Sequence, residues 1–165
     1  MEERQVRKGF GRMKKQLLAW LWPVLWMVLI FTLSHQPAGV SGGISSEIVR
    51  QVFSAIASFV PIEFDTLHTL FRKSAHFFAY LVLGLLFAGA LGKSGMGLQR
   101  ALFVAFALSA LYAASDEFHQ LFIPGRSGEF RDVLIDSAGA ATGLFFYRLI
   151  AAFKWQHDKK AETSW

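Results

Sequence analysis

The sequence predicts an all-α integral membrane protein, in which four transmembrane helices form a bundle and a further amphipathic helix lies on the outer side. Of its 165 residues, 53% are hydrophobic and only 18% are charged, whereas a soluble domain typically carries about 25% charged residues. Four apolar runs approach the length of about 20 residues that spans a bilayer. The basic residues are concentrated on one side of these runs, which is typical of multi-pass membrane proteins.

The first two apolar runs are long enough to cross a membrane directly. Residues 17–33 contain no charge, and residues 74–91 contain one ionisable side chain, His76. The basic N-terminus before the first run is also typical of a signal peptide. However, the run exceeds the usual apolar region of a signal, about 7–15 residues, and no clear cleavage site follows it. We therefore interpret it as a transmembrane helix.

The third and fourth runs are polar at one end. Residues 101–115 are uncharged and lead into a polar segment at 116–120. Residues 132–153 are mostly apolar but include Asp136 and Arg148. Charges of this kind are tolerated where they reach the membrane interface or face the interior of a bundle. Both runs therefore qualify as spans only if their polar ends do so.

Two connections are expected on the outer side. The first contains residues 44–60, whose apolar side chains have helical spacing and which end before Pro61, so we predict an amphipathic helix on the outer leaflet. The second, residues 123–130, has one proline and two glycines, which predicts a tight turn within a helical hairpin. In the last span, Gly139 and Gly143 have the small-xxx-small spacing that lets helices pack closely.

The distribution of charge predicts the direction of insertion. Twelve of the 17 basic residues, but only four of the 12 acidic residues, lie on the side of the two termini. The positive-inside rule then places both termini in the cytoplasm of a multi-pass cell-membrane protein. We expect a basic tail at 1–16, a transmembrane domain at 17–153 and a second tail at 154–165. Nucleic-acid binding is not supported, because no basic-aromatic module is present.

Polar residues gather at the outer ends of all four spans. Asp136 lies one helical turn, about 5.4 Å, deeper than Asp132, and His76 lies similarly inside the second span. Ionisable groups at such depth usually face a bundle interior and pair with one another. Tyr80, on the same helix face, is interpreted as a packed residue, and His35 as a solvent-facing one. The predicted polar site consists of Arg72, Lys73, His76, Asp116, Glu117, His119, Gln120, Arg126, Asp132 and Asp136.

Two polar-rich blocks occur in order along the chain: RKSAHFFAYLVLGLL from Arg72, and SDEFHQLFIPGRSGEFRDVLIDSAGAATG from Ser115. These blocks resemble the signature of the VanZ-like family, named for a membrane protein linked to teicoplanin resistance. The resemblance implies an integral membrane protein whose function is only loosely defined. The family pattern falls on Arg72, Lys73, His76, Tyr80, Asp116, Glu117, Gln120, Pro124, Gly125, Arg126, Asp132 and Asp136.

Three classes of function are consistent with an outer polar site. A binding protein would use its cations, Arg72, Lys73 and Arg126, to hold an amphiphile among membrane lipids. That amphiphile would be a lipid-linked envelope precursor or a lipoglycopeptide such as teicoplanin. A membrane enzyme acting on a lipid-linked phosphate or sugar is the first alternative, although no recognised catalytic signature is present. The second alternative is a polar cluster that orders the bundle without a ligand.

Neither a cofactor nor a metal ion is expected from the sequence. A divalent ion would be held by His76, Asp116, His119 and Asp136. The neighbouring cations Arg72 and Lys73 would repel it, so we predict no metal site and leave the catalytic residues, if any, unassigned.

Overall fold

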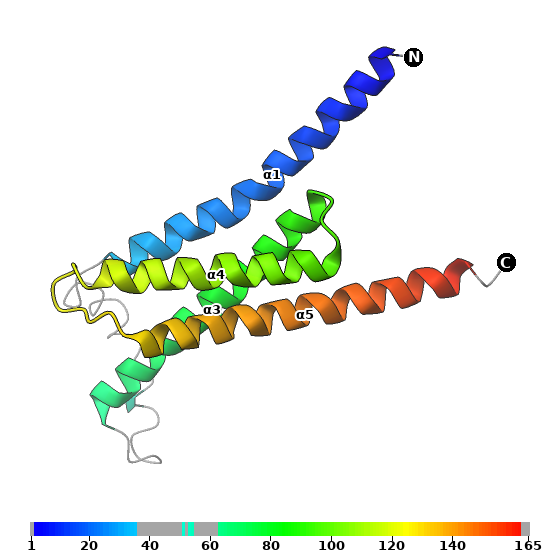
Figure 1. Ribbon diagram of the computed structural model, residues 1–165. Helices are drawn as coiled ribbons and strands as arrows, with labels where there is room; N and C mark the ends of the chain where they lie inside the picture. Colours follow the sequence, from blue (N-terminus) through cyan, green and yellow to red (C-terminus); the bar gives the residue numbers. More distant parts are fainter. Residues whose placement is uncertain (1, 36–50, 52, 55–62, 163–165) are drawn as a thin grey trace.

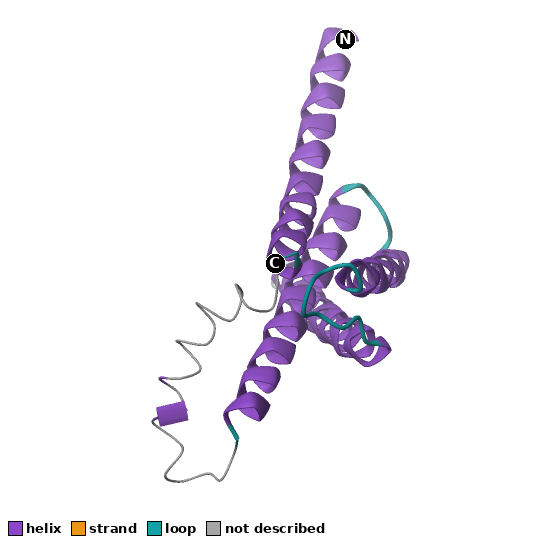
Figure 2. Cartoon of the chain, turned by 90° about the vertical axis from the view of Figure 1, so that its left-hand side faces the viewer, coloured by secondary structure: helices purple, strands orange, loops and turns teal. Residues whose placement is uncertain are grey.

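The protein is described here from a computed structural model, which covers residues 2–35, 51, 53–54 and 63–162. All regular elements in this part of the chain are helices (Figures 1 and 2). The all-α prediction is therefore confirmed. The four helices are α1 (Glu2–Ser34), α3 (Phe64–Lys93), α4 (Leu98–Gln120) and α5 (Phe130–Glu162). The predicted amphipathic helix at 44–60 falls outside the described residues except at Gln51 and at 53–54, which are helical.

Each of the four helices contains a segment that is long and apolar enough to cross a membrane, and each predicted span falls within one of these segments. An even number of crossings brings the start of α1 and the end of α5 to the same side, where Figure 1 shows both helices projecting beyond the bundle. The protein is thus a multi-pass membrane protein. The segments are Gly9–Ser34, Phe64–Lys93, Leu98–Gln120 and Phe130–Phe153.

Helix α3 is the central element, because it packs against α1, α4 and α5. Its contact with α5 is the most extensive, and glycines make it possible. A Cβ atom on Gly139 would overlap the backbone carbonyl of Phe77, and one on Gly143 would overlap that of Leu81. The close packing predicted from the spacing of these glycines is confirmed.

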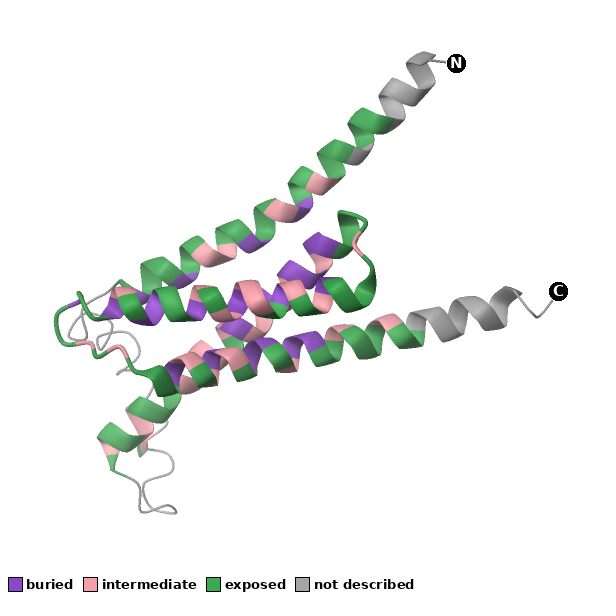
Figure 3. Ribbon diagram, in the orientation of Figure 1, coloured by how far each residue is buried: buried purple, intermediate pink, exposed green. Residues whose placement is uncertain are grey.

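Exposed residues cover much of the outward surface of the helices (Figure 3), and many of them are large and apolar. Large side chains such as Phe103 and Leu111 are 74% and 69% exposed, which suits contact with lipid tails. The interior is instead filled largely by small residues of α4 together with larger ones of α3. The core comprises Ile30, Tyr80, Leu83, Phe87, Ala88, Leu91, Ala101, Ala105, Ala113 and Leu144.

Short loops at opposite ends of α4 connect it to its neighbours. Gly95, in the loop from α3, has a φ of 91°, and Gly125, in the loop to α5, has a φ of 76°. Only glycine adopts these left-handed conformations readily. The α4–α5 loop turns tightly, as the sequence predicts, and Gly128 lies so close to the carbonyl of Glu117 that a side chain would not fit. This loop therefore holds the start of α5 against the end of α4.

Helix α1 is attached to the others by polar contacts as well as by packing. The indole nitrogen of Trp26 donates to the carbonyl of Ala79 in α3 at 2.8 Å. The hydroxyl of Tyr112 in α4 donates to the carbonyl of Met27 at 2.6 Å. Both donors bond to backbone carbonyls of another helix, which is favourable where no water is available. These contacts fix how the C-terminal half of α1 meets α3 and α4.

Candidate functional site

One end of the bundle holds all the buried charged side chains found among the described residues. There α1 and α4 end, α5 begins, and α3 passes with its Arg72–His76 segment. Four acidic residues there are each less than a tenth exposed: Asp116, Glu117, Asp132 and Asp136. The structure thus brings the acidic residues of the predicted polar site to one end. Sequence positions alone led us to expect this convergence.

The outer layer of the site is an ion-pair network between α3 and α5. Lys73 forms an ion pair with Asp132, and Arg72 approaches the second oxygen of the same carboxylate at 3.7 Å. Lys73 Nζ also lies 3.6 Å from Glu129. The side chains of Arg72 and Lys73 remain 32% and 22% exposed. Two cations therefore contact Asp132, and both remain partly exposed at the surface of the bundle.

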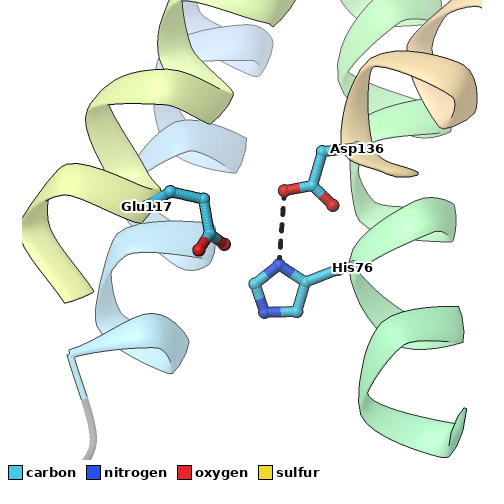
Figure 4. Close-up of side chains that lie close together, drawn as sticks. All are labelled: His76, Glu117 and Asp136. Atoms are coloured by element: carbon cyan, nitrogen blue, oxygen red, sulfur yellow. Dashed lines mark ion pairs between the residues drawn. The ribbon is translucent and has the colours of Figure 1, made fainter. Parts of the chain in front are cut away.

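A deeper layer is formed by His76, Glu117 and Asp136, one residue from each of α3, α4 and α5. Figure 4 shows the imidazole and the two carboxylates pointing toward one another. His76 Nδ1 lies 3.5 Å from Asp136 Oδ2. One ligand-type atom from each residue falls within 4.8 Å of the others. We call these three residues the inner cluster.

Asp136 is the most deeply placed acid, with no exposed surface. Neither of its oxygens accepts a hydrogen bond from any group in the described part of the chain. The His76 contact is an ion-pair approach, too long for a good hydrogen bond. Burying a carboxylate without a hydrogen-bond donor costs free energy. A further partner that interacts with Asp136 would lower this cost.

Asp116 and Glu117 are adjacent and both are buried, but they serve different neighbours. Asp116 accepts a hydrogen bond from Ser34 of α1 at 2.5 Å. Glu117 accepts one from the backbone nitrogen of Glu129 at 3.0 Å. The amide of Gln120 donates to both acids, at 3.4 Å and 3.1 Å. Sequence reasoning left open which acid faces the bundle, and the structure shows that both do.

Tyr80 lies one helical turn beyond His76 and is completely buried. The interpretation of Tyr80 as a packed residue is correct for its ring, which belongs to the core. Its hydroxyl, however, has no hydrogen-bond partner within the described residues, and it interacts electrostatically with Asp116 and Asp136. Tyr80 therefore contributes an unused donor next to the acids, which makes it a site residue that the sequence-based set omits.

His119 is placed at the rim and not in the inner cluster. Its Nε2 lies 3.0 Å from Nδ1 of His35, with one nitrogen donating and the other accepting. The two rings stack, and the His119 ring also contacts Phe31, with centroids 4.7 Å apart. His35 is exposed, as expected, but it is not isolated. Together with Ser34 and Glu129, it is a neighbour of the site that sequence spacing did not identify.

Arg126 comes from the loop between α4 and α5. Its guanidinium donates to the carbonyl of Leu33 at 3.3 Å, which joins this loop to the end of α1. Burial lowers the pKa of Arg126 from its usual range, and the nearby charge of Arg72 lowers it further. Arginine nevertheless stays protonated in proteins. Arg126 and Arg72 therefore present two positive charges close together at this end of the bundle.

The arrangement combines partly exposed cations with a buried group of acids, together with the imidazole of His76 and the phenol of Tyr80. Such a set can bind an anionic headgroup, transfer protons or hold a cation. Comparisons with curated proteins and with solved structures returned no significant match. The VanZ/LLP1 family model matches residues 19–151, which include all four spans' apolar cores and every residue of the polar site. The chain belongs to the VanZ/LLP1 family.

Proposed function

We propose that the protein binds an amphiphilic molecule of the cell envelope in the polar site, at the outer leaflet of the cell membrane, with both termini in the cytoplasm. The observation that carries this proposal is the pair Arg72 and Lys73. Both are partly exposed cations on α3, near the end of the bundle where α4 ends and α5 begins. The excess of basic residues on the side of the two termini supports this orientation.

An amphiphile matches both parts of this surface. Its tail would lie along the exposed apolar faces of the helices, where side chains such as Leu111 point outward. Its charged head would meet Arg72 and Arg126, whose planar guanidinium groups recognise phosphate or carboxylate through two parallel hydrogen bonds. The long Arg72–Asp132 contact, 3.7 Å, leaves donors of Arg72 able to reach a ligand.

Two ligand classes carry the required chemistry. A lipid-linked envelope precursor has phosphate, and a lipoglycopeptide such as teicoplanin has a carboxylate and an acyl chain. The family name is consistent with the second class and with a contribution to antibiotic tolerance. Either ligand would place its anion among the same cations.

Binding of matched lipids to the full-length protein in detergent tests this proposal. We expect a polyprenyl phosphate, or teicoplanin, to bind at least about tenfold more tightly than the uncharged polyprenol, because charge-assisted hydrogen bonds contribute about 1.5–3 kcal/mol each. Arg72→Gln should remove this preference. Lys93→Gln is the matched control, because Lys93 is an exposed cation at the opposite end of α3. Equal affinity for charged and uncharged lipids would refute the proposal.

A membrane enzyme acting on a lipid-linked phosphate or sugar is the second candidate. The observation that favours it is the inner cluster, in which an imidazole lies 3.5 Å from a buried carboxylate and beside a second one. This pairing can move protons between a substrate and the protein. Mass spectrometry of a bound lipid after incubation separates the two candidates, since a binder returns the lipid unchanged.

A further inference from the structure

The inner cluster has a feature that an anionic ligand does not satisfy. Asp136 is fully buried, both of its oxygens lack a hydrogen-bond donor within the described residues, and one of them faces the imidazole of His76 (Figure 4). An anion would add repulsion here. A cation, in contrast, would complete the environment of this carboxylate.

We propose that His76, Glu117 and Asp136 bind one divalent metal ion. The three residues come from three different helices, and one nitrogen and two oxygens fall within 4.8 Å of one another. Tetrahedral ligation at about 2.0–2.2 Å places ligand atoms about 3.3–3.6 Å apart. The His76–Asp136 contact, at 3.5 Å, already has this length. A carboxylate oxygen of Glu117 lies within 4.8 Å of both of these atoms, so a small shift of this side chain would complete the ligand set.

The charges of the inner cluster also match a dication. Neutral His76 with the carboxylates of Glu117 and Asp136 carries two negative charges, and a divalent ion makes the set neutral. Neutrality matters because a net charge inside a membrane-spanning bundle is expensive.

The cations that argued against a metal in the sequence are directed elsewhere. Lys73 and Arg72 both approach Asp132, which lies one turn further out on α5 than Asp136. Asp132 therefore offsets their charge and screens the inner cluster from it. The ligand set also differs from the one considered from sequence alone, because Glu117 replaces Asp116 and His119.

Neighbouring groups hold one of the ligands in position. Gln120 and the backbone nitrogen of Glu129 each donate to a different oxygen of Glu117. Each carboxylate oxygen has a second lone pair, so these bonds leave room for a metal. Such outer hydrogen bonds orient metal ligands in known sites.

The donor set indicates which ions would fit. Imidazole nitrogen suits Zn²⁺ and other transition metals, and carboxylate oxygen suits Mn²⁺ as well. Three protein ligands leave at least one coordination position for water or another ligand, as in catalytic metal sites. Tyr80, one turn from His76 on the same helix face, is fully buried, and its hydroxyl has no hydrogen-bond partner among the described residues.

Metal content of the purified protein tests this proposal directly. The full-length chain is purified in detergent through a tag without histidines, treated with a chelator, reloaded with Zn²⁺ or Mn²⁺, and passed through a desalting column. We expect about one ion per chain by mass spectrometry of the metal. Co²⁺ loading should give the visible absorption of a nitrogen- and oxygen-ligated ion.

Asp136→Asn and His76→Gln should each weaken Zn²⁺ or Mn²⁺ binding by at least about tenfold. Loss of a residue that only supports a metal ligand already lowers metal affinity by about that factor, and these two residues would be ligands themselves. His119→Gln, which changes a histidine that pairs with His35 at the rim, should keep the metal. A wild-type protein that retains no ion, or binding that is lost equally in His119→Gln, would overturn the proposal. The measurement needs no amphiphile, so its outcome is independent of the lipid-binding test.

Discussion

Ser34, at the end of α1, donates a hydrogen bond of 2.5 Å to the carboxylate of Asp116, near the end of α4. Both side chains are buried, with exposures of 2% and 3%. Direct contact between α1 and α4 is otherwise limited. This bond therefore both satisfies a buried acid and links the end of α1 to the end of α4.

Replacing Ser34 by alanine should destabilise the protein by about 1–2 kcal/mol, because Asp116 loses a donor where little water can replace it. The thermal unfolding midpoint in detergent, followed by circular dichroism, would report the loss. Thr32→Ala is the matched control: Thr32 is exposed and bonds only to the carbonyl of Leu29 in its own helix. An equal shift for both variants would show that the Ser34–Asp116 bond contributes nothing specific.

The contact between α3 and α5 predicts unequal responses to the same substitution at three glycines. Gly139→Ala and Gly143→Ala should each cost about 1–3 kcal/mol, because the new methyl group would overlap the backbone of α3 and force the helices apart. Gly89→Ala should be neutral or stabilising, since no atom lies within 4 Å of the added carbon and alanine favours helix. Unfolding midpoints of the three variants check this order, which would be contradicted if Gly89→Ala were the most damaging.

The Lys73–Asp132 pair predicts rescue by exchange of charges. Lys73→Asp alone should lower the yield of folded protein, because three carboxylates, including that of Glu129, would then lie together. The double variant Lys73→Asp and Asp132→Lys should recover part of that yield, since opposite charges again face each other. Monodisperse protein after size-exclusion chromatography is the readout. Failure of the double variant to exceed the single one would mean that the pair is not coupled.

Much of the fold could be predicted because its signals are local. The apolar runs and the glycine-rich turn each depend on neighbouring residues, and the helices lie where these signals indicate. Gly139 and Gly143 could be recognised for the same reason. The predicted helix at 44–60 stays a prediction, because nearly all of it lies outside the described residues.

The orientation of individual side chains could not be predicted in the same way. Asp116 and Glu117 point about 100° apart on a helix, and the sequence does not specify how α4 is rotated relative to α1 and α5. Both acids are buried because the end of α4 contacts Ser34 of α1 and Glu129, the residue just before α5. The same uncertainty hid the pairing of His119 with His35 and the place of Glu117 in the inner cluster.

The side of the membrane on which the polar site lies is a separate prediction. Reporter fusions after Gly95 and after Gly125 sample the two loops that connect α4 at its opposite ends. We expect a periplasmic or extracellular reporter to be active only at Gly125 and a cytoplasmic one only at Gly95, because basic residues favour the side of the Gly95 loop. The reverse pattern would place Arg72 and the inner cluster in the cytoplasm. An envelope precursor displayed on the outer leaflet would then be out of reach, although metal binding by His76, Glu117 and Asp136 would be unaffected, because it depends only on contacts within the bundle.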